Sequence, residues 1–307
     1  MPAESPMKAN ISSHHVSRSC AVTGANGYVG SHISAAFHAK GWRVAAFVHG
    51  TQPLPSYTHR QVAFDLSQPV APETLAGIDT LIHCAYDFRP QARKDIFQTN
   101  VTGSKRLLEA ARTAGVRRII AISTISAFPG CVSLYGQAKL QIEEAAQAAG
   151  AAIVRPGLVF GHGHGGMIGR INGIVRKTPV VPLIGNGSHL QYLAHIDDLC
   201  ALILQLAERE ESLLPADIVT AANSQPKTFK EIIAILSAQY RPRKPLYLPI
   251  PTAIPLEVLR ICRFLGLRLP FSYDNLVSLI HQNPQPDFGP ITQLEIPFRE
   301  FSKHTLD

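Results

Sequence analysis

The chain has 307 residues, of which 46% are hydrophobic and 17% are charged. This composition is typical of a globular protein with a sizeable core and excludes disordered, collagen-like and coiled-coil chains. The formal net charge is +7, but the Lys and Arg residues are spread along the chain without a basic run, which argues against a nucleic-acid-binding protein.

The cysteines and the apolar segments exclude further classes of protein. The 5 cysteines lie far apart and form no CxxC pair, so we expect reduced thiols in the cytoplasm and neither a metal site nor a disulfide framework. The best apolar segment, residues 199–207, is too short to span a bilayer. Residues 1–18 lack the apolar region of a signal peptide and are expected to form a loose leader.

From residue 19 onward, short β-type segments alternate with amphipathic helical ones. Strands are predicted at residues 20–23, 43–48, 61–64, 80–84, 118–123 and 152–155, and helices at 31–40, 93–114 and 135–149. The alternation predicts an α/β fold, a doubly wound parallel sheet of the Rossmann type, over residues 19–156.

The pattern loosens beyond residue 156, where Pro and Gly become frequent. Helices are predicted at residues 196–208 and 229–240, separated by long loops. We expect residues 157–307 to form mainly a small substrate-binding lobe, with some of the chain returning to the sheet.

A glycine-rich turn follows the first predicted strand and opens the first helix. Its sequence, Gly24-Ala-Asn-Gly27-Tyr28-Val29-Gly30, has the spacing GxxGxxG. Glycines let the backbone approach a pyrophosphate, while free N–H groups and the positive end of the helix dipole face its charge. An ordinary glycine turn has the same spacing, but the strand-turn-helix context favours a dinucleotide site.

The end of the second strand bears on the choice between NAD and NADP. No Asp or Glu lies in residues 47–50, where an acid would hold the ribose 2′-hydroxyl of NAD. Arg43, His49 and Arg60 could instead meet a 2′-phosphate, so NADP is favoured over NAD. Asp65 and Leu66 suit the adenine edge, although an Asp at this position also forms turns.

Tyr135 and Lys139 lie four residues apart, so one face of a helix presents both side chains. A nearby ammonium and an oxidised nicotinamide favour the phenolate and suit the phenol to general acid/base chemistry. Surface helices often have the same spacing, and only the combination with the glycine turn favours an active site.

An ordered set of motifs extends over nearly the whole chain. After the glycine turn come Leu81-Ile-His-Cys-Ala85, Asn100-Val-Thr-Gly-Ser104, Ala121-Ile-Ser-Thr-Ile-Ser126, Tyr135 to Lys139, Arg155-Pro-Gly-Leu-Val-Phe-Gly161 and His195-Ile-Asp-Asp-Leu199. With this set the chain resembles the extended short-chain dehydrogenase/reductases, in particular the NAD-dependent epimerase/dehydratase group.

The resemblance implies catalytic roles for the matching residues. Tyr135 would exchange a proton with a substrate hydroxyl or carbonyl, and Lys139 would lower its pKa and hold the nicotinamide ribose. Thr124 would hydrogen-bond the substrate oxygen, with Ser123 as the alternative. Asn100 would support the active-site backbone and the proton path.

The resemblance also implies cofactor contacts and an assembly. Cys84, Ala85 and Tyr86 would line the cofactor channel, and Pro156 would pass beside the nicotinamide amide. A homodimer would form through the helices at residues 93–114 and 135–149.

Two departures from the family pattern bear on the substrate. Only ten residues separate Thr124 from Tyr135, where many sugar-nucleotide epimerases have a longer loop. Gln191 stands where nucleotide-sugar members often have an Arg that grips the diphosphate. Both departures weaken the expectation of a nucleotide-sugar substrate.

The family implies NAD(P)-dependent hydride transfer at a hydroxyl or carbonyl centre, with a sugar or nucleotide sugar as the first expectation. NADPH-dependent reduction of a non-sugar ketone is the first alternative. A non-catalytic dinucleotide-binding scaffold or redox sensor is the second.

Two further segments have competing interpretations. His162 and His164 lie in a glycine-rich loop, where a mobile lid is favoured over a metal site because only two ligands are present. Residues 251–269 could form an amphipathic surface or a membrane-facing stretch, but packing over the substrate pocket is favoured.

Overall fold

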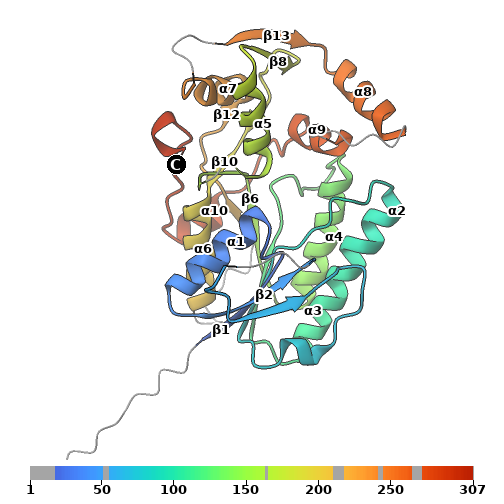
Figure 1. Cartoon of the computed structure of the whole chain (residues 1–307), viewed down its shortest axis with the longest axis vertical. Helices are drawn as coiled ribbons and strands as arrows, with labels where there is room; N and C mark the ends of the chain where they lie inside the picture. Colours follow the sequence, from blue (N-terminus) through green and yellow to red (C-terminus); the bar gives the residue numbers. More distant parts are fainter. Residues whose placement is uncertain are drawn as a thin grey trace, which may run out of the picture.

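The computed structural model describes residues 18–50, 55–162, 165–209, 218–240, 245–264 and 272–306. Two layered regions are visible: a large parallel sheet with helices on both faces, and a smaller C-terminal lobe stacked on one end of it (Figure 1). The predicted leader, residues 1–18, lies outside the described residues except for Arg18.

In the described part of the chain, a seven-stranded parallel sheet has the order β11-β6-β5-β4-β1-β2-β3. Its strands are β1 (Ser19–Thr23), β2 (Arg43–Val48), β3 (Arg60–Ala63), β4 (Thr80–His83), β5 (Arg118–Ile122), β6 (Ala152–Pro156) and β11 (Val219–Ala221). The crossover between β1 and β4 gives the doubly wound order, so the predicted Rossmann-type fold is confirmed.

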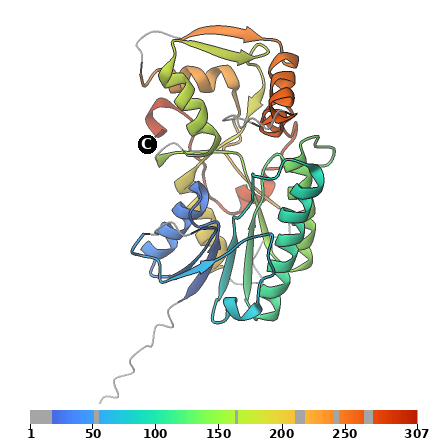
Figure 2. The same ribbon diagram turned by 45° about the vertical axis from the view of Figure 1, so that its right-hand side comes forward.

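Helices cover both faces of the sheet, as Figure 2 shows. One face carries α1 (Tyr28–Ala39) and α6 (Ile196–Glu208), and the other carries α3 (Gly103–Thr113) and α4 (Leu134–Ala148). Alternate residues of β2 point to opposite faces: Val44 packs with α1 and α6, whereas Phe47 packs with α3. Burial on both faces explains why these strands are almost continuously apolar.

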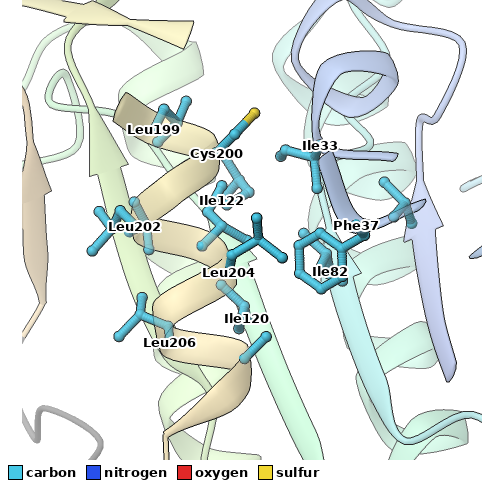
Figure 3. Packing of buried hydrophobic residues seen from close by; sticks show 14 of the residues in the cluster. Ile33, Phe37, Ile82, Ile120, Ile122, Leu199, Cys200, Leu202, Leu204 and Leu206 are labelled. Atoms are coloured by element: carbon cyan, nitrogen blue, oxygen red, sulfur yellow. The ribbon is translucent and has the colours of Figure 1, made fainter. Parts of the chain in front are cut away.

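The core between α1, α6 and the sheet consists of buried apolar side chains. Ile33 and Phe37 of α1 face Ile82 of β4, and the leucines of α6 lie beside Ile120 of β5 (Figure 3). The sheet layer therefore includes α6 and β11, which follow residue 157 in the chain. Short α10 (Gly289–Gln293) packs beside β11.

Most predicted boundaries agree with the structure within a few residues. Strand 43–48 and helix 196–208 match β2 and α6. The helix predicted at 93–114 consists of α2 (Arg93–Ile96), a π-helical segment η2 (Phe97–Thr102) and α3. A 3-10 turn, η1 (Pro72–Leu75), lies between β3 and β4.

The C-terminal lobe has a core of its own around Phe160, Leu183 and Phe301. Its strand pairs are β7 (Leu158–Phe160) with β10 (Leu193–His195), β9 (Leu190–Gln191) with β12 (Lys227–Thr228), and β8 (Val180–Ile184) with β13 (Leu246–Ile250). Its helices are α5 (Gly166–Lys177), α7 (Phe229–Ser237), α8 (Ala253–Phe264) and α9 (Tyr273–Ile280), followed near the C-terminus by the 3-10 turn η5 (Lys303–Thr305).

For the described helix α8, the expectation that residues 251–269 pack over the substrate pocket stays a prediction. Ile254, Val258 and Ile261 are 54%, 49% and 55% exposed. The helix adjoins α9, and its Leu256 and Leu259 side chains are half-buried. Among the described helices, none has both the length and the apolar character to cross a bilayer.

Candidate active site

The glycine turn joins β1 to α1 in a conformation that requires glycine. Gly24 has a φ of +67°, and a Cβ on Gly30 would lie 2.2 Å from the carbonyl oxygen of Gly24. Gly27 caps α1 with its backbone, and the first turn of α1 contains no acidic residue. The helix dipole and the backbone N–H groups at this turn fit a dinucleotide pyrophosphate.

Tyr28 and Val29 begin α1 within the same turn. The Tyr28 hydroxyl donates a 2.5 Å hydrogen bond to the carbonyl oxygen of Gly161, which follows β7. Val29 is partly buried against the core beneath α1. Tyr28 therefore ties the dinucleotide turn to the C-terminal lobe.

His49 and Asp65 meet at the carboxyl ends of β2 and β3. The His49 Nε2 atom lies 3.3 Å from the Asp65 Oδ2 atom, and both residues line an open hollow of about 340 Å³. The backbone N–H of Ser67 holds the pKa of the Asp65 carboxyl below its usual range. Leu66, beside them, is buried. This hollow suits the adenosine end of a dinucleotide.

Arg43 and Arg60 do not reach that edge. Each is the first residue of its strand, and parallel strands all begin at the edge of the sheet opposite the glycine turn. The Arg43 guanidinium contacts His59, and the Arg60 guanidinium donates to the Thr74 carbonyl oxygen. The expectation that these arginines meet a 2′-phosphate is therefore wrong, whereas His49 directly follows β2 and its contact with a 2′-phosphate stays a prediction.

Cys84, Ala85 and Tyr86 leave β4 alongside the glycine turn. The Thr23 hydroxyl accepts hydrogen bonds of 3.1 Å from the N–H groups of Cys84 and of Ala85. Beneath it, the His83 Nδ1 atom lies 2.8 Å from the Thr23 hydroxyl, and burial lowers the pKa of His83 to about 3. A neutral, buried imidazole thus fixes the path of this loop.

Asn100 fixes the next part of the same loop. It is fully buried in η2; its Oδ1 atom accepts a 2.7 Å bond from the Asp87 N–H, and its Nδ2 atom donates a 3.0 Å bond to the Asp87 carbonyl oxygen. π-helical segments are frequent at functional sites. Here the segment contains the Asn100 amide that holds the backbone between Tyr86 and Phe88.

Tyr135 lies in the first turn of α4 inside an aromatic cluster. Its ring centroid is 4.9 Å from that of Tyr86 and 5.6 Å from that of Phe88. Phe88 is 62% exposed. Burial raises the pKa of Tyr135 to about 12, a hydrogen bond with Thr124 lowers it, and the charge of Asp274 raises it. The phenol is therefore protonated at neutral pH.

The structure separates the two candidate hydroxyls after β5. Thr124 hydrogen-bonds Tyr135, whereas the Ser123 hydroxyl donates to the Glu143 carboxylate. Glu143 is 3% exposed and forms a bidentate ion pair with Arg155, with N–O distances of 2.8 and 2.6 Å. Thr124 thus faces the phenol and Ser123 faces a buried ion pair.

Lys139 is buried one helical turn after Tyr135. Its Nζ atom donates a 2.7 Å hydrogen bond to the Ile122 carbonyl oxygen and lies 5.3 Å from the centre of the Tyr86 ring. Burial lowers the pKa of Lys139 to about 8. Pro156, also buried, ends β6, and its carbonyl oxygen accepts a 2.9 Å bond from the Ile125 N–H.

Asp274 is a residue that the sequence analysis missed. Its Oδ1 atom accepts a 2.7 Å bond from the Leu134 N–H, and its Oδ2 atom accepts a 2.8 Å bond from the Tyr135 N–H. A carboxylate of α9 thus caps the N-terminus of α4 from the other lobe. No local pattern signals this contact, because Asp274 lies 139 residues from Tyr135 in the chain.

Gln191 and His162 are the two remaining candidate residues of the C-terminal lobe. Gln191 is fully buried, and its Nε2 atom donates a 2.7 Å bond to the Leu279 carbonyl oxygen at the end of α9. The His162 Nε2 atom lies 3.0 Å from Asp197 Oδ1, and His164 lies outside the described residues. Across the described ranges, no group of three His, Cys, Asp or Glu residues could hold a metal ion.

Comparison with known proteins extends these observations. A ceramide reductase from Caulobacter vibrioides is 30% identical over 190 residues, covering 60% of this chain and 59% of that protein. The human sterol-4-alpha-carboxylate 3-dehydrogenase (decarboxylating) is 24% identical over 241 residues, covering 68% of this chain and 63% of that protein. The chain thus spans less than two thirds of either relative.

Solved structures share the fold at lower identity. MoeE5, solved in complex with UDP-glucose and NAD, is 22% identical with a TM-score of 0.64, covering 86% of this chain and 97% of that one. The gox2253 structure is 19% identical with a TM-score of 0.69, covering 94% and 95%.

The family assignment rests on the sheet, the glycine turn and a sequence match that includes both. Residues 20–222 match the sequence profile of the NAD dependent epimerase/dehydratase family. That span runs from β1 to the end of β11 and contains the Tyr135 and Lys139 pair. The chain belongs to the NAD dependent epimerase/dehydratase family, within the extended short-chain dehydrogenase/reductases.

Proposed function

We propose that this protein reduces a ketone of a lipophilic, non-sugar substrate with NADPH, using Tyr135 as the proton donor. The observation that carries the proposal is the exposed Phe88 ring, which lies against Tyr135 and is 62% exposed. Val132, in the short loop before α4, is 55% exposed. An apolar approach to the phenol favours an apolar substrate over a polar sugar.

Gln191 supports the same choice from the lobe side. Its amide is engaged with the Leu279 carbonyl oxygen, and a buried neutral amide cannot form the bidentate ion pair that an arginine forms with a diphosphate. Two relatives are named for lipid substrates, a ceramide reductase and a sterol-4-alpha-carboxylate 3-dehydrogenase. The sugar or nucleotide-sugar substrate expected from the sequence becomes the alternative.

A protonated Tyr135 is the form that reduction requires. Because burial raises its pKa to about 12, the phenol can donate a proton to a carbonyl oxygen at neutral pH. Thr124, which hydrogen-bonds Tyr135, would hydrogen-bond the same oxygen, and the buried Lys139 ammonium would stabilise negative charge on the phenol after the proton leaves. The bound dinucleotide would supply the hydride.

The residues around the glycine turn would hold that dinucleotide. The N-terminus of α1 would face the pyrophosphate, Asp65 and Leu66 the adenine, and His49 the ribose 2′-position. By sequence no Asp or Glu lies in residues 47–50, where an acid would hold the ribose 2′-hydroxyl of NAD, which favours NADP over NAD.

A substrate panel tests the proposal. We expect the purified protein to oxidise NADPH with a long-chain 3-oxo lipid or a 3-oxosteroid and to leave UDP-glucose unchanged. Tyr135→Phe should lower turnover by about 10²- to 10⁴-fold, the range for a lost general acid, while NADPH binding persists. Epimerisation of UDP-glucose, or full activity of Tyr135→Phe, would contradict the proposal.

Three broader expectations are also proposals. We propose a cytoplasmic location, a homodimer formed through α2, η2, α3 and α4, and a division into a dinucleotide-binding domain (residues 19–156) and a mainly substrate-binding lobe (residues 157–307). Light scattering of the purified protein tests the dimer. Limited proteolysis with and without NADPH tests the division, because bound dinucleotide should protect the first part more than the second.

A further inference from the structure

The ribbon formed by β8 and β13 has an apolar outer face. Val180 is paired with Leu246, and Pro182 with Leu248, in the parallel register. Val180, Leu246 and Leu248 are 38%, 68% and 54% exposed, whereas Val181 and Leu183 between them are buried. A strand with one buried face normally carries polar residues on the other. This ribbon is apolar on both faces.

Helix α8 continues that face beyond the ribbon. Its exposed residues Ile254, Val258 and Ile261 lie at i, i+4 and i+7 and so form one stripe along the helix. We define the ribbon-helix face as Val180, Leu246, Leu248, Ile254, Val258 and Ile261. Figures 1 and 2 show β8, β13 and α8 together at the end of the molecule opposite the large sheet.

The charge of this region is strongly positive. In the sequence, residues 241–271 contain β13 and α8. The charged residues of this stretch are one acid, Glu257, and the basic residues Arg241, Arg243, Lys244, Arg260, Arg263 and Arg268. This stretch therefore holds most of the net charge of +7, although basic residues as such are spread along the chain. Among the described residues, Lys230 places its ammonium 5.2 Å from the centre of the Tyr247 ring on β13.

We propose that the ribbon-helix face docks on the surface of an anionic lipid bilayer, with its apolar side chains in the headgroup region and with the net positive charge of the sequence around β13 and α8 attracting the anionic surface. A second copy of the chain is disfavoured, because a two-fold symmetric contact would bring two copies of this positively charged sequence together. An anionic bilayer instead neutralises the charge and covers the apolar residues together.

The ribbon-helix face lies near the candidate active site, so docking on a bilayer would bring that site close to the lipids. Helix α8 adjoins α9, and Asp274 of α9 binds the N-terminus of the helix that carries Tyr135. The face is therefore one helix away from the candidate catalytic residue. A lipophilic substrate could then pass from the bilayer to the site, but the docking proposal does not depend on which reaction occurs there.

The experiment is co-sedimentation of the full chain with vesicles, with no turnover as a readout. We expect binding to vesicles of phosphatidylglycerol and phosphatidylcholine in equal amounts, weaker binding to phosphatidylcholine alone, and loss of binding as salt is raised. The double variant Ile254→Asp, Val258→Asp should reduce vesicle partitioning by at least about 10-fold, since each buried apolar side chain contributes about that factor or more.

Matched controls separate the outcomes. Leu190→Asp alters a residue on β9 that is 50% exposed and outside the face, so it should bind vesicles like the unchanged protein. Thermal melting of each variant checks that the fold is retained. Equal binding of the double variant and the unchanged protein would overturn the proposal. So would dissociation of a dimer by the double variant without any change in vesicle binding, which would assign the face to self-association.

Discussion

The dinucleotide-binding layer and the C-terminal lobe differ in how far their apolar side chains are buried. Strands β1 and β2 are covered by helices on both faces, and the polar groups beside them, such as His83 and Asn100, have buried hydrogen-bond partners. The lobe leaves Leu246 and Val258 exposed. In the first region the exposed Phe88 ring, in the loop after β4, lies against Tyr135. The first region buries most of its apolar residues, whereas the lobe has apolar side chains on its surface.

This difference predicts which changes damage the fold and which damage only recognition. Glu143→Ala should have the largest effect, because it leaves the partly buried Arg155 guanidinium without its partner. The free energy of unfolding should fall by about 3 kcal/mol, the lower end of the range for breaking a buried ion pair, because Arg155 keeps some contact with solvent. Denaturant titration measures it. Glu144→Ala, at the exposed neighbouring position, is the control and should change stability by less than about 0.5 kcal/mol.

Gly30→Ala should weaken dinucleotide binding by roughly 10- to 100-fold, which corresponds to strain of about 1–3 kcal/mol. The added Cβ would lie 2.2 Å from the Gly24 carbonyl oxygen and push the turn apart. Titration with NADPH checks this. Gly173→Ala, in α5, is the matched control because a Cβ there meets nothing within 4 Å. If Gly30→Ala bound NADPH as tightly as the unchanged protein, the glycine turn would not be the rigid element that we infer for the dinucleotide-binding layer.

Phe88→Ser should leave the fold and NADPH affinity unchanged and lower kcat/KM for a lipophilic ketone by about 10-fold, since one apolar contact is lost. Initial rates with the lipid substrate and NADPH titration separate the two effects. Leu190→Ser removes a similarly exposed apolar side chain from β9 and should be neutral. An equal loss of NADPH affinity in Phe88→Ser would show that Phe88 contributes to the dinucleotide site and would contradict its assignment to the substrate approach.

Asp274→Asn should have the smallest effect, a change in pH dependence. Reduction needs a protonated Tyr135, so the rate falls as pH rises through the pKa of the phenol. Because the charge of Asp274 raises that pKa, its removal should move the alkaline limb of the pH profile to lower pH. Asp287→Asn removes another capping carboxylate, at α10, and should leave the limb in place. A shift to higher pH would contradict this reading.

Much of the fold and part of the site could be predicted from the sequence. The glycine turn and the Tyr135 and Lys139 pair are local patterns whose geometry follows from a strand-turn-helix unit and from helix periodicity. Arg43 and Arg60 were misjudged because each lies at the start of its strand, whereas the glycine turn follows the end of β1. The strand direction in the parallel sheet decides that.

The sequence by itself determined the parallel sheet, the glycine turn and the helix that carries Tyr135 and Lys139, because each depends on residues within one or two elements. Only the tertiary structure decided that Thr124 faces the phenol while Ser123 faces Glu143, and that Asp274 caps the helix of Tyr135. It also decided that α8 lies outside the core. The physical reason is that hydrogen bonds and burial between distant segments depend on how the two lobes pack, which no local periodicity encodes.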